Sequence, residues 1–205
     1  EGWSISSVVN LQGATPWAVT DGTSATSSSS NLSGTGKPER WSMFGDAKDF
    51  NSFGRYEHVP CFGVANSAFG SDLACTSVAN VSLMPKACID AANSLPTNPI
   101  IASSDARSTG IKSLGSLGCY VAGNSVIVPP AQGTFGNMGK GIFRSSGFHN
   151  WDVSIRKDIQ VIERLRAQFQ FDMYNVTNTP HFSIPGGNGN TSANNLVAPA
   201  EFGAS

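Results

Sequence analysis

Hydrophobic and polar side chains alternate one by one in two neighbouring stretches of the chain, over residues 151–157 and 164–174. Successive side chains of a β-strand point to opposite sides, so this period of two predicts two strands, each with one apolar and one polar face. A polar pair, Lys157 and Asp158, is expected to separate the two strands. The predicted apolar face comprises Trp151, Val153 and Ile155 on the first strand and Leu165, Ala167, Phe169, Phe171 and Met173 on the second.

Two kinds of sheet contain strands of this type. An antiparallel sheet with one side in water shows the same alternation. So does an outer-membrane barrel, whose strands are apolar toward lipid and polar toward a hydrated lumen. The stretch 164–174 has about the length of roughly 9–11 residues that a tilted strand needs to cross a bilayer. Alternation alone leaves both explanations open.

The same alternation occurs near the N-terminus. Residues 2–12 predict another strand, and residues 17–20 are expected to pair with it after a turn at residues 13–16. The segment 61–130 is rich in glycine and serine and is expected to be mostly loop, with a short helix at 85–94 and a short strand at 125–128. The sequence therefore predicts an all-β fold in a single unit over residues 1–205, with strands near 2–20 and 148–176.

All four cysteines, Cys61, Cys75, Cys88 and Cys119, lie in the segment 61–130. An even number of cysteines in such a segment indicates two disulfides and an oxidising compartment. Four cysteines allow three pairings, of which loop length favours Cys61–Cys75 with Cys88–Cys119; four free thiols are the alternative. A zinc site would need closer pairs such as C-x-x-C, and the sequence has none.

Composition and motifs exclude several functions. The net charge is −1 and only 13% of residues are charged, so no basic stripe is available for nucleic acid. The segment 133–141 departs from a phosphate-binding loop at Thr134 and Gly141. The histidines at 58, 149 and 181 have no partner at metal-ligand spacing. We therefore expect no enzyme, no cofactor and no metal site.

Four motifs follow one another between residues 135 and 185: F-G-N at 135–137, G-F-x-N-W-D at 147–152, E-R-x-x-x-Q-F at 163–169, and N-x-x-N-x-P-x-F at 175–182. In this order they resemble the C-terminal strands of TonB-dependent outer-membrane receptors, in the branch with a carboxypeptidase-regulatory-like domain before the plug. Residues 2–22 are similar to an earlier strand pair of the same region. The resemblance implies antiparallel strands of an outer-membrane-type barrel, with long disulfide-bearing loops on the outside that contact a ligand.

A complete receptor of this kind has a barrel of about 22 strands, whereas this chain supplies four to six. Strands 151–157 and 164–174 contain no proline, so their edges are expected to pair with strands from elsewhere. Two hypotheses follow. The chain is the C-terminal part of an outer-membrane receptor, with the remainder of the barrel as its partner. Alternatively, it is a secreted or shed β-rich subunit that polymerises with further copies of itself into an extracellular filament by strand pairing.

Overall fold

The computed structural model describes residues 2–17, 19, 40–51, 58–184, 196 and 202. The chain divides into two compact units. Glu1–Thr15 with Ser146–Phe182 form what we call the strand unit, and Pro16–Ser145 with Ser183–Ser205 form the disulfide unit. The sequence suggested a single unit. The structure has two, because the segment between the first and last long strands builds a core of its own.

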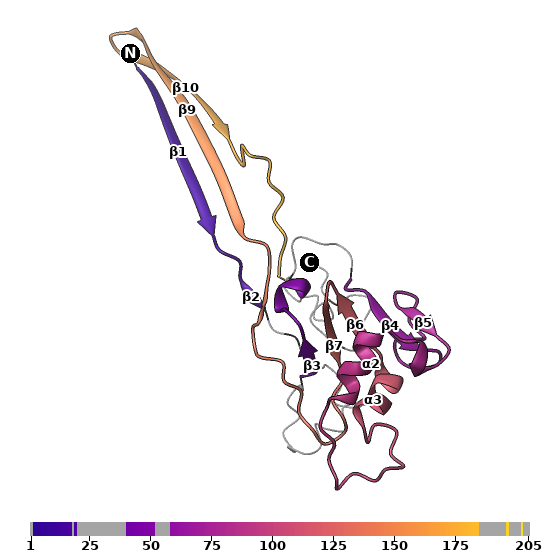
Figure 1. Cartoon of the computed structure of the whole chain (residues 1–205). Coiled ribbons are helices and arrows are strands. Elements are labelled where there is room, and N and C mark those ends of the chain that lie inside the picture. The colour runs from indigo at the N-terminus through magenta and orange to yellow at the C-terminus, as the bar shows by residue number, and fades with distance from the viewer. Residues whose placement is uncertain are drawn as a thin grey trace. The chain divides into compact units, whose positions relative to one another are not determined.

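The strand unit is a three-stranded antiparallel sheet in the order β1-β9-β10 (Figure 1). Its strands are β1 (Trp3–Gln12), β9 (Phe148–Ile162) and β10 (Leu165–Met173). β1 pairs with β9 along its whole length, from Trp3 opposite Lys157 to Gln12 opposite Phe148. Alternation in the sequence predicted all three strands. β9 is the central strand of the sheet, so the edges are β1 and β10, whereas the edge of residues 151–157 was expected to pair with a strand from outside the chain.

Lys157 and Asp158 do not interrupt β9, contrary to the sequence-based expectation. The strand runs through them for 15 residues. The alternation continues across the pair, because Lys157 lies in line with Ile155 and Ile159 and places its ammonium 4.8 Å from the centre of the Trp3 ring. Asp158 forms an ion pair with Arg156, with 3.4 Å between the Asp158 Oδ2 and Arg156 Nε atoms. The first strand therefore ends five residues later, at a tight connection through Glu163 and Arg164.

The expected hairpin between residues 2–12 and 17–20 is also wrong. β2 (Pro16–Trp17) pairs with β8 (Phe143–Arg144) in the disulfide unit. Trp17 is buried there, with its ring 5.0 Å from that of Phe143. Burying an indole stabilises the fold more than a four-residue hairpin arm would. Ala18 and Thr20 lie outside the described residues.

The disulfide unit contains a five-stranded sheet in the order β3-β7-β6-β4-β5, in which only the β4–β5 pair is parallel. The strands are β3 (Ser42–Phe44), β4 (Cys61–Val64), β5 (Thr76–Val78), β6 (Cys119–Ala122) and β7 (Ser125–Val128). The helices are α2 (Lys86–Asn93), α3 (Gly110–Leu117) and the 3-10 turns η1 (Ala47–Phe50) and η2 (Val81–Leu83).

Two elements of this unit were predicted from the sequence, the helix at α2 and the strand at β7. Residues 61–130 contain more regular structure than expected, because β4, β5, β6 and α3 also lie there. The strands have three or four residues, too few to show a period. α3 contains two glycines that weaken a helical signal, but the Thr109 hydroxyl accepts a bond from the Lys112 amide and caps its first turn.

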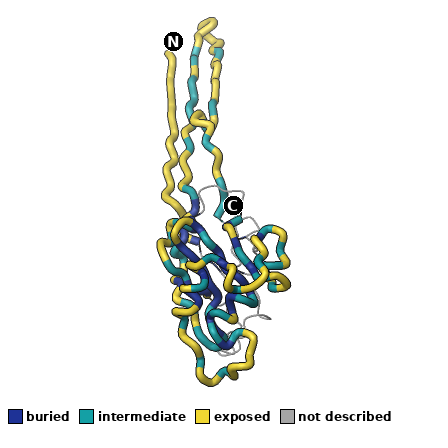
Figure 2. Tube along the Cα trace, turned by 45° about the vertical axis from the view of Figure 1, so that its right-hand side comes forward, coloured by how far each residue is buried: buried dark blue, intermediate teal, exposed yellow. Residues whose placement is uncertain are grey.

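The five-stranded sheet is packed on both faces. Tyr120 and Ile127 point into an aromatic cluster with Trp41, Phe69 and Phe202. Their strand neighbours point the other way, into a cluster with α2 and α3, which contains Cys88, Leu114, Cys119, Val126 and Val128. Figure 2 shows buried residues gathered in this unit, while the three long strands are exposed or half-buried. The described chain is thus mostly antiparallel β-structure, as predicted, with two short helices and no closed barrel.

Candidate functional site

The register of the strand unit places most of the apolar side chains of all three strands on one face. Three rows run straight across the sheet: Ser7–Val153–Met173, Ile5–Ile155–Phe171 and Trp3–Lys157–Phe169. Val9 lies opposite Trp151, and Ala167 opposite Ile159. The residues predicted as an apolar face, apart from Leu165, therefore lie in these rows together with alternate residues of β1. Leu165 pairs with Ile162 beyond a register shift, at the end of the sheet.

This apolar face is not covered by other described residues. Ile5 is 73% exposed, and Phe169 and Phe171 are each 64% exposed. Scattered apolar side chains are normal on a protein surface, but a continuous apolar face on three strands marks contact with lipid or with another protein. We call it the apolar face from here on.

The opposite face of the same sheet is polar. Its rows include Ser6–Ser154–Asp172 and Ser4–Arg156–Gln170, and Asp158 lies opposite Gln168. The Asp172 carboxylate accepts a hydrogen bond from the Ser154 hydroxyl at 2.5 Å and from the Gln170 amide at 3.0 Å. These polar side chains satisfy one another's hydrogen-bonding groups on an exposed surface, as expected of a sheet face in contact with water.

Lys157 places a charged side chain on the apolar face. It is half-buried, and it lies between Trp3 and Phe169 in the same row. Its contact with the Trp3 ring is a cation–π interaction. Among the described residues it forms no ion pair, because Asp158 points to the other face and pairs with Arg156.

Asp152 holds the segment after β10 against β9. One carboxylate oxygen accepts a bond from the Asn175 amide at 2.8 Å, and the Asn150 side chain donates to both oxygens at 2.9 and 3.0 Å. The Val176 amide donates to the Trp151 carbonyl at 2.8 Å. The N-W-D and N-x-x-N motifs thus meet in space and shape one turn. Sequence reasoning missed this role, although the motif spacing signalled it.

Asn175 and Asn178 build the rest of that turn. Both have φ of 48°, the left-handed region that asparagine tolerates better than most residues. The Asn175 side chain accepts a bond from the Thr179 amide at 3.1 Å and donates to the Thr179 carbonyl at 3.0 Å. We call the turn held by Asp152 and Asn175 the Asp152 turn.

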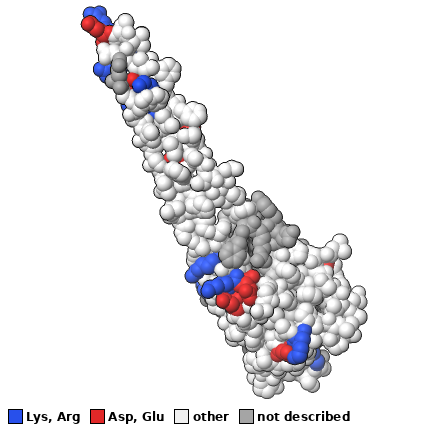
Figure 3. Space-filling model, turned by 45° about the horizontal axis from the view of Figure 1, so that its top comes forward, with Lys and Arg blue, Asp and Glu red and all other residues white. Residues whose placement is uncertain are grey.

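The two ends of the three-stranded sheet differ. At one end β9 and β10 are joined by only Glu163 and Arg164. Figure 3 shows Lys, Arg, Asp and Glu atoms gathered near this end, with uncharged atoms along most of the sheet. At the other end the chain leaves β1 at Gln12 and returns to β9 at Phe148, and the residues between form most of the disulfide unit.

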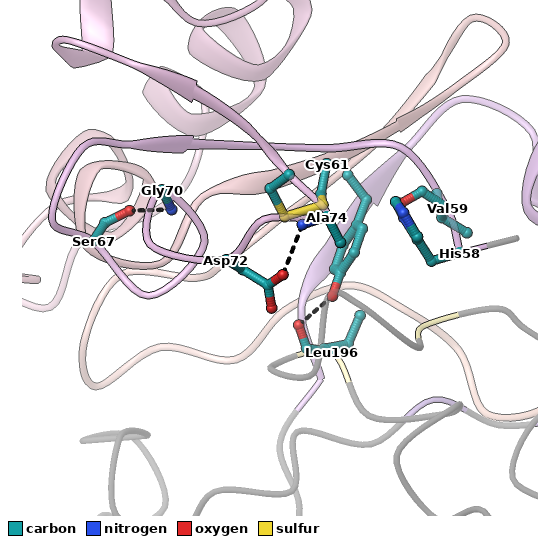
Figure 4. The surroundings of a disulfide bond; sticks show 10 residues. His58, Val59, Cys61, Ser67, Gly70, Asp72, Ala74 and Leu196 are labelled. Atoms are coloured by element: carbon teal, nitrogen blue, oxygen red, sulfur yellow. Dashed lines mark hydrogen bonds between the residues drawn. A yellow bond between two sulfur atoms is a disulfide. The ribbon is translucent and has the colours of Figure 1, made fainter.

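The disulfide unit contains both predicted bonds, Cys61–Cys75 and Cys88–Cys119. Figure 4 shows the first of them, which closes a loop shaped by short local bonds. The Gly70 amide donates to the Ser67 hydroxyl at 3.0 Å, and the Ala74 amide donates to the Asp72 carboxylate at 2.9 Å. Leu73 is fully exposed in this loop. The described cysteines are all oxidised, so the alternative of free thiols is wrong.

Segments far apart in the sequence complete this unit. The Tyr120 hydroxyl donates to the Leu196 carbonyl at 2.7 Å, and the Val59 amide donates to the Phe202 carbonyl at 2.8 Å. Leu196 and Phe202 are fully buried. The chain that follows β10 therefore packs into the same core as the chain that follows β1.

No described group of three His, Cys, Asp or Glu side chains comes together as metal ligands would. His149 and His181, distant in sequence, do meet, with ring centres 6.1 Å apart, and His181 stacks on Phe148 at 4.1 Å. The carboxylates of Asp152 and Asp172 are engaged separately by their own partners. Asp152 and Asp172 therefore do not form an acid–base pair.

Comparisons with known proteins give one match. Residues 1–204 match the family described as outer membrane beta barrel domain. No curated protein and no solved structure matches the chain. In the part of the chain that the structure describes, no helix has the length and apolar character needed to span a membrane.

Proposed function

The chain belongs to the outer membrane beta barrel domain family and is an outer-membrane protein, and from this premise we propose that it is the C-terminal part of the barrel of a TonB-dependent receptor. In this role it is not an enzyme. The strand unit forms part of the barrel wall, and the disulfide unit lies outside the cell and contacts the ligand.

The observation that carries the proposal is the pair of opposite faces on one sheet. Barrel strands in a membrane alternate between side chains that face lipid and side chains that face the lumen. The rows Ile5–Ile155–Phe171 and Ser4–Arg156–Gln170 are neighbours in register and lie on opposite faces. The apolar face meets lipid in this arrangement, and the polar face meets water in the lumen.

The edges of the sheet support a partner that supplies further strands. β1 and β10 each have one neighbouring strand in the described part of the chain. Edge strands of ten and nine residues expose long rows of unpaired backbone groups. In a barrel these edges pair with the remaining strands. Pairing with copies of the same chain is the alternative that would give a filament.

The unequal ends of the sheet support the orientation. Outer-membrane barrels have short turns on the periplasmic side and long loops on the outer side. The two-residue connection between β9 and β10 fits the periplasmic side. The long connection between β1 and β9 fits the outer side, and its two disulfides suit that oxidising location.

Labelling of new single cysteines in the intact protein, in its native membrane, tests the placement of the sheet. Phe171→Cys should react with a lipid-soluble maleimide and resist a charged one. Gln168→Cys, on the polar face, should show the opposite preference. If the charged reagent labels both variants equally, the apolar face is in water and the barrel assignment fails. Protection of Phe171→Cys from both reagents would instead favour the filament.

Cross-linking in cells tests the receptor class. A TonB-dependent receptor should form an adduct with TonB after formaldehyde treatment. A second, known receptor in the same cells serves as the control. Absence of an adduct for this protein, with an adduct for the control, would contradict the TonB-dependent assignment while leaving the barrel intact.

A further inference from the structure

We propose that Lys157 and the groove around it bind an anionic phospholipid of the inner leaflet, with the ammonium on the lipid phosphate and an acyl chain along the apolar side chains. This inference rests on the proposed function, because it requires the apolar face to meet lipid. It adds a specific ligand site to a surface that would otherwise be only a hydrophobic wall.

The groove is formed by cross-strand rows. Lys157 stands on the central strand, with Trp3 on one side and Phe169 on the other. The groove has a volume of about 520 Å³, and its apolar lining includes Ile155, Ile159 and Phe171. Lys157 is the charged residue of the lining, which otherwise consists of aromatic and aliphatic side chains and Gln170. This combination suits a molecule with one negative group and a hydrocarbon chain.

The charge of Lys157 has no counterpart among the described residues around it. Its ammonium lies over the Trp3 ring, 4.8 Å from the ring centre. A lysine on the lipid side of a barrel is costly at the bilayer midplane and far better tolerated near the interface. Its long side chain can reach toward the headgroups while its methylenes stay on the apolar surface. An anionic headgroup then supplies the missing counter-charge.

The position of Lys157 selects the leaflet. It lies five residues from the end of β9 at Ile162, which is roughly 17 Å along a strand at about 3.3 Å per residue. That end carries the short connection assigned to the periplasmic side. Trp3 lies beside it, and tryptophan is enriched at the interface between lipid and water. The Lys157 side chain extends along the apolar surface toward that end, where the available anion is the phosphate of a phospholipid headgroup.

Quenching of Trp3 fluorescence by brominated lipids tests the site in the intact reconstituted protein. The protein is placed in phosphatidylcholine vesicles that contain a minor fraction of brominated phosphatidylglycerol, or the same fraction of brominated phosphatidylcholine. A Trp3→Phe variant isolates the signal of Trp3 by difference. The wild type should show about fivefold enrichment of phosphatidylglycerol at Trp3, since one lysine near an anionic surface contributes about 1 kcal/mol.

Variants of the charge complete the test. Lys157→Met should lose the enrichment and Lys157→Arg should keep it. Arg156→Met, a neighbouring charge on the polar face, should leave it unchanged. Added inorganic phosphate should not reverse the enrichment of phosphatidylglycerol, because a free anion makes no contact with the apolar side chains of the groove. Reversal by phosphate would overturn the assignment to a lipid.

Two other results would overturn the proposal in distinguishable ways. If both brominated lipids quench Trp3 equally in the wild type, Lys157 contacts only Trp3, and the specific site fails while the lipid-facing sheet stands. If Trp3 and Trp151 resist quenching in vesicles made wholly of brominated phosphatidylcholine, the apolar face does not meet lipid. The proposed function and the phospholipid site then fail together.

Discussion

The strand unit and the disulfide unit place their apolar side chains in opposite ways. In the strand unit every residue of β1 is exposed, and the aromatic residues of β10 stand on an open face. In the disulfide unit Trp41, Phe69 and Tyr120 are fully buried around a shared centre. The disulfide unit thus supplies its own interior, whereas the strand unit requires apolar surroundings from outside.

This difference in the burial of apolar side chains shows that the two units of one chain suit different surroundings. A barrel wall keeps its apolar residues outward because lipid takes the place of a core. A domain in water must bury them and gains about 25 cal/mol for each Å² of apolar surface removed. Substitutions should therefore have different effects in the two units, and the following experiments probe that contrast.

The largest effect is expected for Trp41→Ala in the disulfide unit. Trp41 is fully buried, with its ring 5.8 Å from Phe69 and 6.1 Å from Tyr120. Loss of a buried aromatic residue costs about 3–5 kcal/mol. Urea unfolding followed by near-ultraviolet circular dichroism measures the loss. Leu73→Ala, at a fully exposed position of the same unit, should change the midpoint little. Equal midpoints for the two variants would contradict the buried core.

Removing the Cys88–Cys119 bond by the double change Cys88→Ala and Cys119→Ala should have the next largest effect. The bond spans 31 residues, for which the chain-entropy model gives about 4 kcal/mol. The Cys61–Cys75 bond spans 14 residues and should contribute about 3 kcal/mol. Limited proteolysis of the intact protein should cut the disulfide unit and leave the strand unit protected by the membrane. Simultaneous cleavage of both units would show that they do not unfold separately.

Phe171→Arg should destabilise the strand unit by about 2–4 kcal/mol, since it places a charge near the middle of the apolar face. Gln168→Arg is the matched control, because it lies on the polar face of the same strand, opposite Asp158. The amount of heat-modifiable protein in the outer membrane measures assembly. We expect a loss for Phe171→Arg alone. A loss for Gln168→Arg alone would mean that the two faces are exchanged.

The smallest effect is expected for Asp152→Ala, which removes the acceptor of the Asn175 amide. Hydrogen bonds to charged groups contribute about 1.5–3 kcal/mol. Amide hydrogen exchange should become faster at Asn175 and Val176, which the Asp152 turn holds against β9. Asp172→Ala should leave these two amides unchanged, because Asp172 bonds only to Ser154 and Gln170 among the described residues. Unchanged exchange in Asp152→Ala would show that the turn does not depend on its carboxylate.

The sequence by itself determined the two faces of each long strand. Which side a strand residue takes is a local property, set by the alternation of neighbouring side chains. The faces predicted for β9 and β10 therefore agree with the register of the structure. The motifs that resemble an outer-membrane receptor agree with the family to which the chain belongs. The helix α2 could be predicted for the same local reason, since it begins after Pro85.

Only the tertiary structure decided which segments meet. Trp3 lies opposite Lys157 across most of the length of the chain, and no local pattern encodes that pairing. Trp17 does not form the expected hairpin, because packing of its ring against Phe143 stabilises the fold more. Phe202, near the far end of the chain, packs against the same ring. Likewise, the pairing of β9 with β10 brings the Asp152 carboxylate within hydrogen-bond distance of the Asn175 amide. Alternation sets the side on which a residue lies, but long-range packing and register choose its neighbour.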